Sequence, residues 1–222
     1  MFGLVWLLAL AVVVSCADAQ RDSANSSTYS YRCDGNDQVD EDQVIVVTLD
    51  GDRGHLFSRQ ASQAIQRQPD TPAFAGDDVY YLPAQSADLA PGQTAEITIK
   101  GNKLVNCKNN PRAAVWEEAK LRGVSYRAIG HEPPWLLEID RGNGFLLVTG
   151  YGEEKQQFPY VEPVTDSTQR TSSYSSEANG EGIIIAIQGG DCRDSMSGEA
   201  FSSQAVISWR GQRLHGCGRA LH

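Results

Sequence analysis

The stretch DQVIVVTLDGDRGHLF, residues 42–57, decides the fold of the first half of the chain. Its β-branched run at residues 42–49 favours a strand. The polar, glycine-containing segment 50–54 is typical of a turn, and His55-Leu56-Phe57 begins a second strand. The stretch therefore predicts a β-hairpin.

Strand patterns continue along this region. Residues 79–82 favour a further strand, and residues 94–100 alternate polar and apolar side chains, as a half-buried strand does. Gly101-Asn102 would turn that strand back into residues 103–107. We therefore expect residues 31–109 to form a small all-β domain.

A short helix is expected after this domain, at residues 110–123. Asn110 is a good N-cap, Pro111 suits the first helical position, and Gly123 suits the position after the C-cap. We expect the helix to pack between two domains. The residues expected to share its buried face, with the lysine stem covering the indole, are Ala113, Trp116 and Lys120.

The remaining residues, 124–222, again favour strands and predict a second β domain. Residues 163–180 are rich in Ser, Thr and Gln and fit either a long loop or an exposed hairpin. Residues 182–187 are apolar enough for a buried strand. The predicted fold class is all-β, with two small antiparallel β-barrel-like domains joined by a short helix. The segments with strand character are 124–129, 135–139, 145–149, 182–187, 205–209 and 212–217.

Four cysteines lie in these two regions, and an even number of thiols in an exported protein indicates disulfides. A bridge from Cys33 to Cys107 would tie the first strand of its domain to the last. Closing so long a loop would stabilise the domain by about 4 kcal/mol in the chain-entropy model. A bridge from Cys192 to Cys217 would clamp the loop 191–198 onto the last strand.

Residues 1–16 are expected to be a signal peptide. A hydrophobic run, Leu4–Val14, leads into Val13-Val14-Ser15-Cys16, which is similar to a bacterial lipobox, in which the cysteine is acylated and becomes the new N-terminus. Lipidation of Cys16 would account for the unpaired fifth cysteine. A competing cleavage signal, Ala17-Asp18-Ala19, would instead release a chain that begins at Gln20.

Residues 17–30 are small and polar, and we expect a flexible tether there. No second apolar stretch approaches the length of a membrane span, so a lipid would be the only membrane anchor. The expected location is the outer membrane, facing the periplasm. Cleavage at the competing site would make the protein soluble in the periplasm.

The chain is acidic, with a net charge of −9 and a pI of about 4.9, which disfavours nucleic acid as a partner. Residues 32–107 contain twelve Asp and Glu against six Lys and Arg, whereas residues 108–222 contain fourteen against twelve. The first region is therefore the better surface for a cationic protein. Solubility alone would explain the same charge.

The best cluster for catalysis is the segment 190–198, which places hydroxyls beside carboxylates. Ser195 would need a histidine base, and only the fold could bring His131 or His215 to it. Arg193 departs from the nucleophile-elbow pattern. A turn capped by Asp and Ser beside a disulfide explains the segment better.

Two further histidine segments are candidate sites. His131 and Glu132 could serve acid–base chemistry or bind a metal, but the following Pro133-Pro134-Trp135 favours a rigid turn into a strand. His215 and Cys217 have the proximity of a metal-binding pair, but the thiols of an exported protein oxidise, so a disulfide is favoured. We expect no enzymatic activity, no metal and no cofactor.

Several short motifs span residues 31–107. They are Tyr31-Arg32-Cys33-Asp34-Gly35, the strand 44–49, Asp52-Arg53-Gly54-His55-Leu56-Phe57, Gly92-Gln93-Thr94-Ala95-Glu96-Ile97 and the closing Cys107. Together they resemble the membrane-bound inhibitors of c-type lysozyme. The resemblance implies a small β-barrel with the same outer disulfide, usually behind a lipobox, and c-type lysozyme as the partner.

Inhibitors of that family reach the lysozyme carboxylates with a Ser from one loop and a Lys from another. The corresponding segments here are 75–80 and 89–92, in which Ala75 stands for the Ser and Pro91 for the Lys. Neither side chain can place a cation between two catalytic carboxylates. The candidate inhibitor-loop residues are Ala75, Gly76, Asp77, Pro91 and Gly92.

Residues 115–220 resemble an uncharacterised envelope domain that is often joined to the first one in bacterial lipoproteins. The segments that carry this resemblance are 116–117, 121–123, 126–133, Trp135, 192–198 and 216–219. The two resemblances imply an envelope lipoprotein that binds or inhibits c-type lysozyme. The alternative is a non-inhibitory binding or structural module of the cell envelope.

Overall fold

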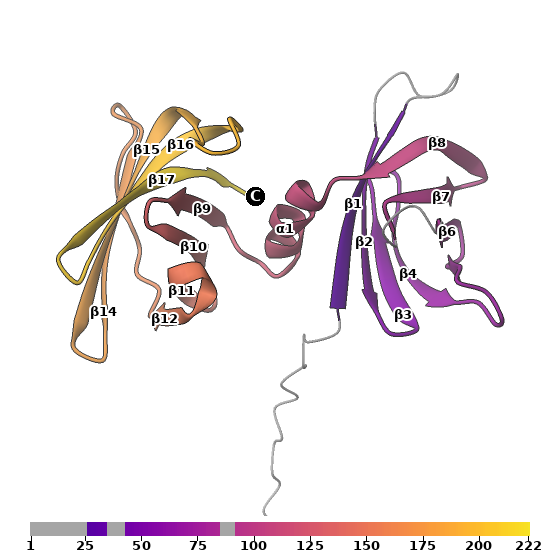
Figure 1. The fold of residues 1–222 in the computed structure, drawn as a ribbon, viewed down its shortest axis with the longest axis horizontal. Helices are drawn as coiled ribbons and strands as arrows, with labels where there is room; N and C mark the ends of the chain where they lie inside the picture. Colours follow the sequence, from indigo (N-terminus) through magenta and orange to yellow (C-terminus); the bar gives the residue numbers. More distant parts are fainter. Residues whose placement is uncertain (1–25, 35–42, 85–91) are drawn as a thin grey trace, which may run out of the picture.

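The computed structural model describes residues 26–34, 43–84 and 92–222, which form two β units joined by one short helix (Figure 1). The predicted all-β fold class is confirmed. No helix in these ranges is long and apolar enough to cross a bilayer. The expected signal peptide with Cys16 and the loop residue Pro91 lie outside the described residues.

The first unit is a closed antiparallel barrel in which each strand pairs with the next and β8 returns to β1. The predicted hairpin is confirmed as β2 and β3, with Asp50 opposite Arg53. The strands are β1 (Ser26–Asp34), β2 (Gln43–Asp50), β3 (Arg53–Phe57), β4 (Ser62–Arg67), β5 (Phe74–Ala75), β6 (Val79–Pro83), β7 (Thr94–Ile99) and β8 (Asn102–Asn109).

Side chains from every strand of the barrel fill its interior, and burying them supplies most of its stability. The predicted disulfide between Cys33 and Cys107 is confirmed, and it links β1 to β8 at the point where the barrel closes. The largest fully buried side chains in this core are Tyr31, Ile45, Leu56, Phe74, Tyr81, Ile97 and Ile99.

The sequence prediction placed residues 26–30 in a tether, and this was wrong. β1 already begins at Ser26 and pairs with β2 from its first residue, opposite Asp50. A polar strand is stable here because the neighbouring strand pairs with its backbone while Tyr29 packs against the barrel core. The rest of the expected tether, residues 17–25, lies outside the described residues.

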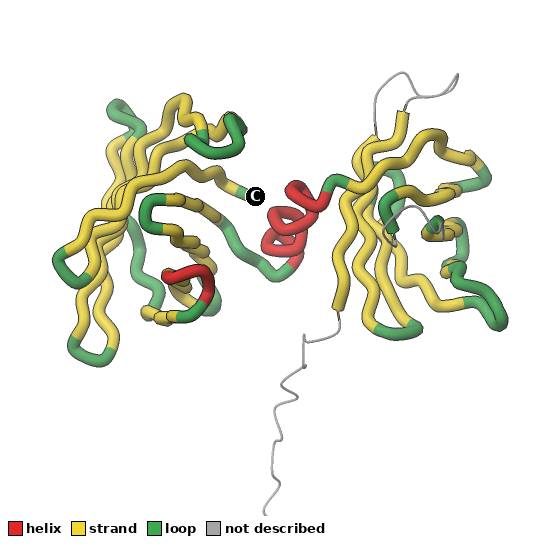
Figure 2. The backbone as a smooth tube through the Cα atoms, in the orientation of Figure 1, coloured by secondary structure: helices red, strands yellow, loops and turns green. Residues whose placement is uncertain are grey.

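Helix α1 (Pro111–Leu121) begins where the sequence predicted. The Asn110 side chain accepts a hydrogen bond from the Ala113 amide, and Gly123 adopts a positive φ of 97° just beyond the helix. Both features satisfy backbone groups that a helix end leaves without partners. Figure 2 shows the helix between the two β units.

The predicted helix face was partly wrong. Ala114, Trp116 and Ala119 are buried, whereas Lys120 is exposed. The cations that cover the Trp116 ring come from the second unit, with Arg219 at 4.5 Å and Arg127 at 5.4 Å from the ring centroid. Contacts with the second unit, rather than with Lys120 one turn along the helix, therefore cover the Trp116 ring.

The second unit is a nine-stranded antiparallel sheet in the order β12-β11-β10-β9-β17-β16-β15-β14-β13. It curls into a half-barrel around its own core, as Figure 1 shows. The strands are β9 (Tyr126–His131), β10 (Pro134–Asp140), β11 (Gly144–Thr149), β12 (Glu154–Phe158), β13 (Val164–Asp166), β14 (Thr171–Ala178), β15 (Glu181–Arg193), β16 (Ala200–Trp209) and β17 (Gln212–Ala220); a one-turn 3-10 helix, η2 (Gly150–Gly152), precedes β12.

Three details of this unit refine the sequence predictions. The strand expected from residue 124 begins at Tyr126. Of the two alternatives for residues 163–180, the hairpin is present, as β13 and β14. The strand expected to be buried at 182–187 is buried on one face only, because Ile183 and Ile185 point into the core while Ile184 is 52% exposed. A curled sheet leaves its convex face to solvent, so one alternate set of side chains stays outside.

Candidate functional site

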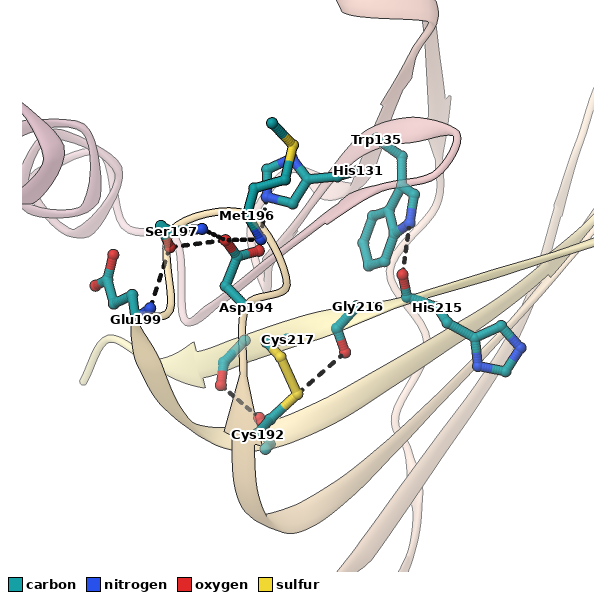
Figure 3. The surroundings of a disulfide bond; sticks show 12 residues. His131, Trp135, Cys192, Asp194, Met196, Ser197, Glu199, His215, Gly216 and Cys217 are labelled. Carbon is teal, nitrogen blue, oxygen red and sulfur yellow. Dashed lines mark hydrogen bonds and ion pairs between the residues drawn. A yellow bond between two sulfur atoms is a disulfide. The ribbon is translucent and has the colours of Figure 1, made fainter.

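A polar groove of about 370 Å³ lies on the outer face of β9, β16 and β17. It brings together three sequence segments that had been singled out separately: the β9–β10 turn, the segment after Cys192, and the end of the chain around His215 (Figure 3). The side chains that line it include His131, Glu132, Arg193, Asp194, Ser195, Gln204, Val206 and His215.

Trp135 lies on the core side of the sheet, behind the part of the groove formed by Gly130 and Gly216. Its indole N–H donates to the His215 carbonyl at 3.3 Å. Two glycines make room for the ring, since a Cβ on Gly130 would lie 2.2 Å from Trp135 Nε1 and one on Gly216 would lie 2.6 Å from Trp135 Cζ2. The expectation that Trp135 anchors a core is confirmed, because it belongs to the buried core of the half-barrel.

The opposite side of the groove is the turn that follows β15, and Asp194 organises it. One carboxylate oxygen accepts hydrogen bonds from the Ser197 amide at 2.6 Å, the Ser197 hydroxyl at 2.7 Å and the Met196 amide at 3.2 Å. The other oxygen lies 2.6 Å from His131 Nε2 (Figure 3). The interpretation of this segment as a turn capped by Asp and Ser beside a disulfide is therefore confirmed.

The environment of Asp194 keeps its carboxylate charged. Burial raises its pKa, but the hydrogen bonds from Ser197 and the nearby His131 outweigh burial and lower the pKa overall. A charged carboxylate is the better acceptor for the amides of its own turn. Asp194 therefore holds the turn in place and connects it to β9.

The structure brings Ser195, His131 and His215 to one groove but does not assemble them as a catalytic triad. Among the described residues, no hydrogen bond joins Ser195 to either histidine. The carboxylate that would orient a histidine base also supports the turn of Ser197. In this geometry neither histidine is placed to take the proton of the Ser195 hydroxyl.

The disulfide between Cys192 and Cys217 is confirmed, and it fastens the turn to β17. The Cys217 sulfur is therefore bonded to Cys192. The sequence favours this disulfide over a metal site formed with His215. Within the described ranges, no group of three or more His, Cys, Asp and Glu side chains could hold a metal ion.

The candidate inhibitor loops of the first barrel lie apart from this groove and from each other. Ala75 ends β5, and Gly76 and Asp77 form the turn into β6, where the Gly76 amide donates to Val79 at 2.9 Å. Gly92 lies two residues before β7, whose Ala95 pairs with Pro83 at the other end of β6. At about 3.3 Å per residue, the two ends of β6 are roughly 13 Å apart.

The Gly92 segment is held by two tyrosines from β1. The Tyr31 hydroxyl donates to the Gly92 carbonyl at 2.8 Å and lies 2.9 Å from the Tyr81 hydroxyl. A Cβ on Gly92 would lie only 2.5 Å from the Tyr29 ring, and its φ is 76°, so a glycine is required here. Burial raises the pKa of Tyr81 to about 12 and raises that of Tyr31 further.

A buried charge cluster beside the helix was missed in the sequence. Glu138 is 4% exposed and lies between Arg122, at 2.9 Å from both of its oxygens, and Arg127, at 2.5 Å from one. Burial lowers the pKa of Arg127, although Glu138 opposes this effect. The sequence did contain a signal for this cluster. Glu138 interrupts the apolar run that begins with Trp135-Leu136-Leu137, and an acidic side chain in a buried strand needs a partner.

Arginines of the second unit pack against helix α1. Arg219 lies over both Trp116 and Phe201, whose ring centroids are 5.2 Å apart, and Cys217 joins the same small core. The groove, the disulfide and the residues that pack against helix α1 are therefore parts of one continuous structure.

Comparison of the chain with protein-family models, with curated proteins and with solved structures found no match.

Proposed function

We propose that this protein is a bacterial envelope lipoprotein that binds a c-type lysozyme through its first barrel and has no catalytic activity of its own. The observation that carries the proposal is the closed eight-stranded barrel with a disulfide between its first and last strands. That architecture is what the resemblance to lysozyme inhibitors implies. Two disulfides are also consistent with export to an oxidising compartment.

Charge supports the choice of partner. The first region carries twice as many acidic as basic residues, and c-type lysozymes are strongly cationic. Opposite charges speed encounter and favour a correct orientation more than they raise affinity. Exposed carboxylates at the β5–β6 turn, Asp77 and Asp78, lie beside the segment that corresponds to an inhibitor loop.

The positions of the two candidate loops argue for binding with weak inhibition. The Gly76 turn and Gly92 lie at opposite ends of β6, so one lysozyme cleft would contact one of them. Ala75 and Pro91 also lack the groups that enter the cleft in the family inhibitors. We therefore expect a complex in which muramidase activity is only partly lost.

The test is to measure binding of the purified mature chain to a c-type lysozyme by biolayer interferometry, with a turbidity assay of muramidase activity in parallel. We expect binding that weakens at least about tenfold between 50 and 500 mM salt, because screening acts on exposed charges. The double variant Asp77→Asn/Asp78→Asn should bind more weakly. The matched control is Asp70→Asn, in the β4–β5 connection at the other end of the barrel. Absence of binding at tens of micromolar would refute the proposal.

A second candidate function rests on a different observation. The groove around His131 and His215 offers imidazole, carboxylate, guanidinium and amide groups on an otherwise regular sheet face. Such a set suits a polar ligand of the cell envelope, and the protein would then be a non-inhibitory binding module. Shifts of the His131 and His215 NMR signals on addition of envelope glycan fragments, without any effect of lysozyme, would favour this function.

A further inference from the structure

The two disulfides differ in how far a dissolved reagent can reach them. Cys33 and Cys107 are 0% and 2% exposed, and both belong to the core of the closed barrel. Cys217 is 5% exposed, but Cys192 is only partly buried, and both line the polar groove (Figure 3). In the folded protein, a thiol in solution therefore meets the second disulfide and not the first.

The two sulfur atoms of the groove disulfide are not equivalent. Cys217 packs with Trp116 and Phe201 in a small core, and Cys192 lies at the margin of that core. Cys192 Sγ is also 3.7 Å from the carbonyl oxygen of Gly216. A thiolate on Cys192 would face this oxygen, whereas a thiol could donate its S–H to it. Access and charge both favour Cys192 as the sulfur that is attacked and Cys217 as the sulfur that leaves.

The surroundings of Cys217 also favour its departure as an anion. The guanidinium of Arg219 lies over the Trp116 ring at 4.5 Å and over the Phe201 ring at 5.9 Å from the centroids. These are the two rings that pack with Cys217. A cation close to a cysteine stabilises its thiolate, which offsets the cost of forming an anion in a small apolar core.

We propose that the disulfide between Cys192 and Cys217 is a thiol–disulfide exchange site, which a dithiol reductant reaches through the polar groove. A thiolate of the reductant bonds to Cys192 Sγ, the bond between the two cysteines breaks, and its electron pair leaves with Cys217. The second thiolate of the reductant then attacks the reductant sulfur that is joined to Cys192 and releases Cys192. Two electrons pass to the cysteines, which take up two protons as thiols, and the reductant becomes a disulfide.

The strand that carries Cys192 is built to hinge once the disulfide is open. The ladder between β15 and β16 shifts its register between Gly189 and Cys192, and such a bulge bends a strand. Only two ladder pairs, Cys192 with Phe201 and Arg193 with Ala200, lie beyond the bulge. The end of this hairpin therefore has little regular pairing of its own, and the disulfide is its covalent attachment to β17.

Reduction should change the groove without unfolding the sheet. Two polar contacts still hold the turn in the reduced protein: Asp194 with His131 at 2.6 Å, and Glu199 with Arg219 at 3.8 Å. Contacts between partly exposed groups are weaker than a covalent bond, so we expect the turn to move more freely. The groove is the site of the second candidate function, and exchange would regulate ligand binding there. The exchange reaction itself depends on neither proposed function.

The first experiment tests selectivity. The folded mature chain is treated with dithiothreitol at pH 8, free thiols are alkylated at set times, and peptide mass spectrometry locates them. We expect Cys192 and Cys217 to be alkylated at least about a hundredfold faster than Cys33 and Cys107, with an unchanged far-UV circular dichroism spectrum. Equal rates for the two pairs, or no reduction before the protein unfolds, would overturn the proposal.

The second experiment tests the path through the groove. Gln204 lines the groove and pairs directly with Cys217 across β16 and β17, so Gln204→Trp should cover the disulfide and slow its reduction at least about fivefold. The matched control is Gln188→Trp, on the neighbouring strand and outside the groove lining, which should react at the wild-type rate. A wild-type rate for Gln204→Trp would overturn the proposal.

The third experiment tests which sulfur is attacked and by what kind of thiol. A thioredoxin whose second cysteine is replaced by serine cannot complete the exchange, so it should stay joined to the chain at Cys192. Joining at Cys217 would overturn the direction of attack. Intact thioredoxin and dithiothreitol, compared at equal dithiol concentration, identify the better reductant as a protein or a small molecule, and faster reduction by either one supports the exchange site. Amide exchange in residues 190–199 should be at least about tenfold faster after reduction, and unchanged exchange there would overturn the regulatory role.

Discussion

His131 Nε2 lies 2.6 Å from Asp194 Oδ2, and this contact joins the β9–β10 turn to the turn that follows β15. The disulfide between Cys192 and Cys217 fastens the same turn to β17. One polar contact and one covalent bond therefore hold a segment that the regular sheet pairing does not reach. The shape of the polar groove depends on both links.

Replacing Asp194 should destabilise the protein in a pH-dependent manner. Asp194→Ala removes an acceptor of three hydrogen bonds and should lower the free energy of unfolding at pH 7 by about 2 kcal/mol. Because the fold lowers the pKa of Asp194, its stabilisation is present above the ordinary aspartate pKa and is lost as the pH falls through the lowered value. Urea unfolding at pH 7 and at pH 2.5 measures the difference between wild type and variant, which should shrink at the lower pH. A pH-independent difference would contradict this account.

Replacing Trp116 should weaken the connection between the helix and the second unit. Trp116→Ala removes a buried ring that contacts Phe201 and two arginines, and should cost about 3 kcal/mol of unfolding free energy. The control Val115→Ala changes the neighbouring but exposed side chain and should stay within about 0.5 kcal/mol. Thermal unfolding followed by circular dichroism measures both variants. Equal effects of the two would show that Trp116 is not part of a core.

Replacing Glu138 should leave two arginines without their shared counter-charge. Glu138→Gln keeps the shape but removes the negative charge between Arg122 and Arg127, and should cost about 3 kcal/mol. Glu118→Gln is the matched control, because Glu118 pairs with Arg122 at the surface and should contribute less than about 1 kcal/mol. Denaturant unfolding of each single variant gives the comparison. A small effect of Glu138→Gln would mean that water takes over the role of the carboxylate.

Replacing Tyr31 should loosen the segment at Gly92. Tyr31→Phe removes hydrogen bonds to the Gly92 carbonyl and to Tyr81 inside the barrel, and should cost about 2 kcal/mol. Tyr29→Phe is the control, since among the described residues the Tyr29 hydroxyl makes no hydrogen bond to this network. Amide exchange near Gly92 should become faster in Tyr31→Phe alone.

The same tyrosines make the first barrel sensitive to alkali. Because burial raises the pKa of Tyr81 to about 12, the folded state holds its proton more tightly than the unfolded state does. Their contribution to stability is therefore complete below about pH 10 and falls as the pH rises toward 12. Urea unfolding across this range should show less of this loss in Tyr31→Phe than in wild type. An unchanged profile would contradict the assignment.

Much of the architecture was accessible from local sequence patterns. The hairpin at residues 42–57, the cap of α1 at Asn110 and the strand ladder up to Cys107 each depend on neighbouring residues only. The error at residues 26–30 has a physical cause, because a polar segment becomes a strand when β2 supplies its hydrogen-bond partners. The composition of residues 26–30 alone does not show that β2 lies beside them.

The candidate groove was predicted in pieces but not as a whole. His131, Ser195 and His215 had each been singled out, and the fold brings them to one surface. Their roles depended on distances between distant segments, and these distances favour a structural Asp194–His131 contact over a triad. Gly76 and Gly92 show the reverse. The family resemblance places both in inhibitor loops, but the strand register puts them at opposite ends of β6.

The amino-acid sequence by itself determined the all-β class and the helix between the two units, because periodicity and capping residues are properties of short segments. Only the tertiary structure decided which face of α1 is buried and which cations surround Glu138. These features depend on strand register and on the curl of the sheet, which arise from contacts between residues that are far apart in the chain.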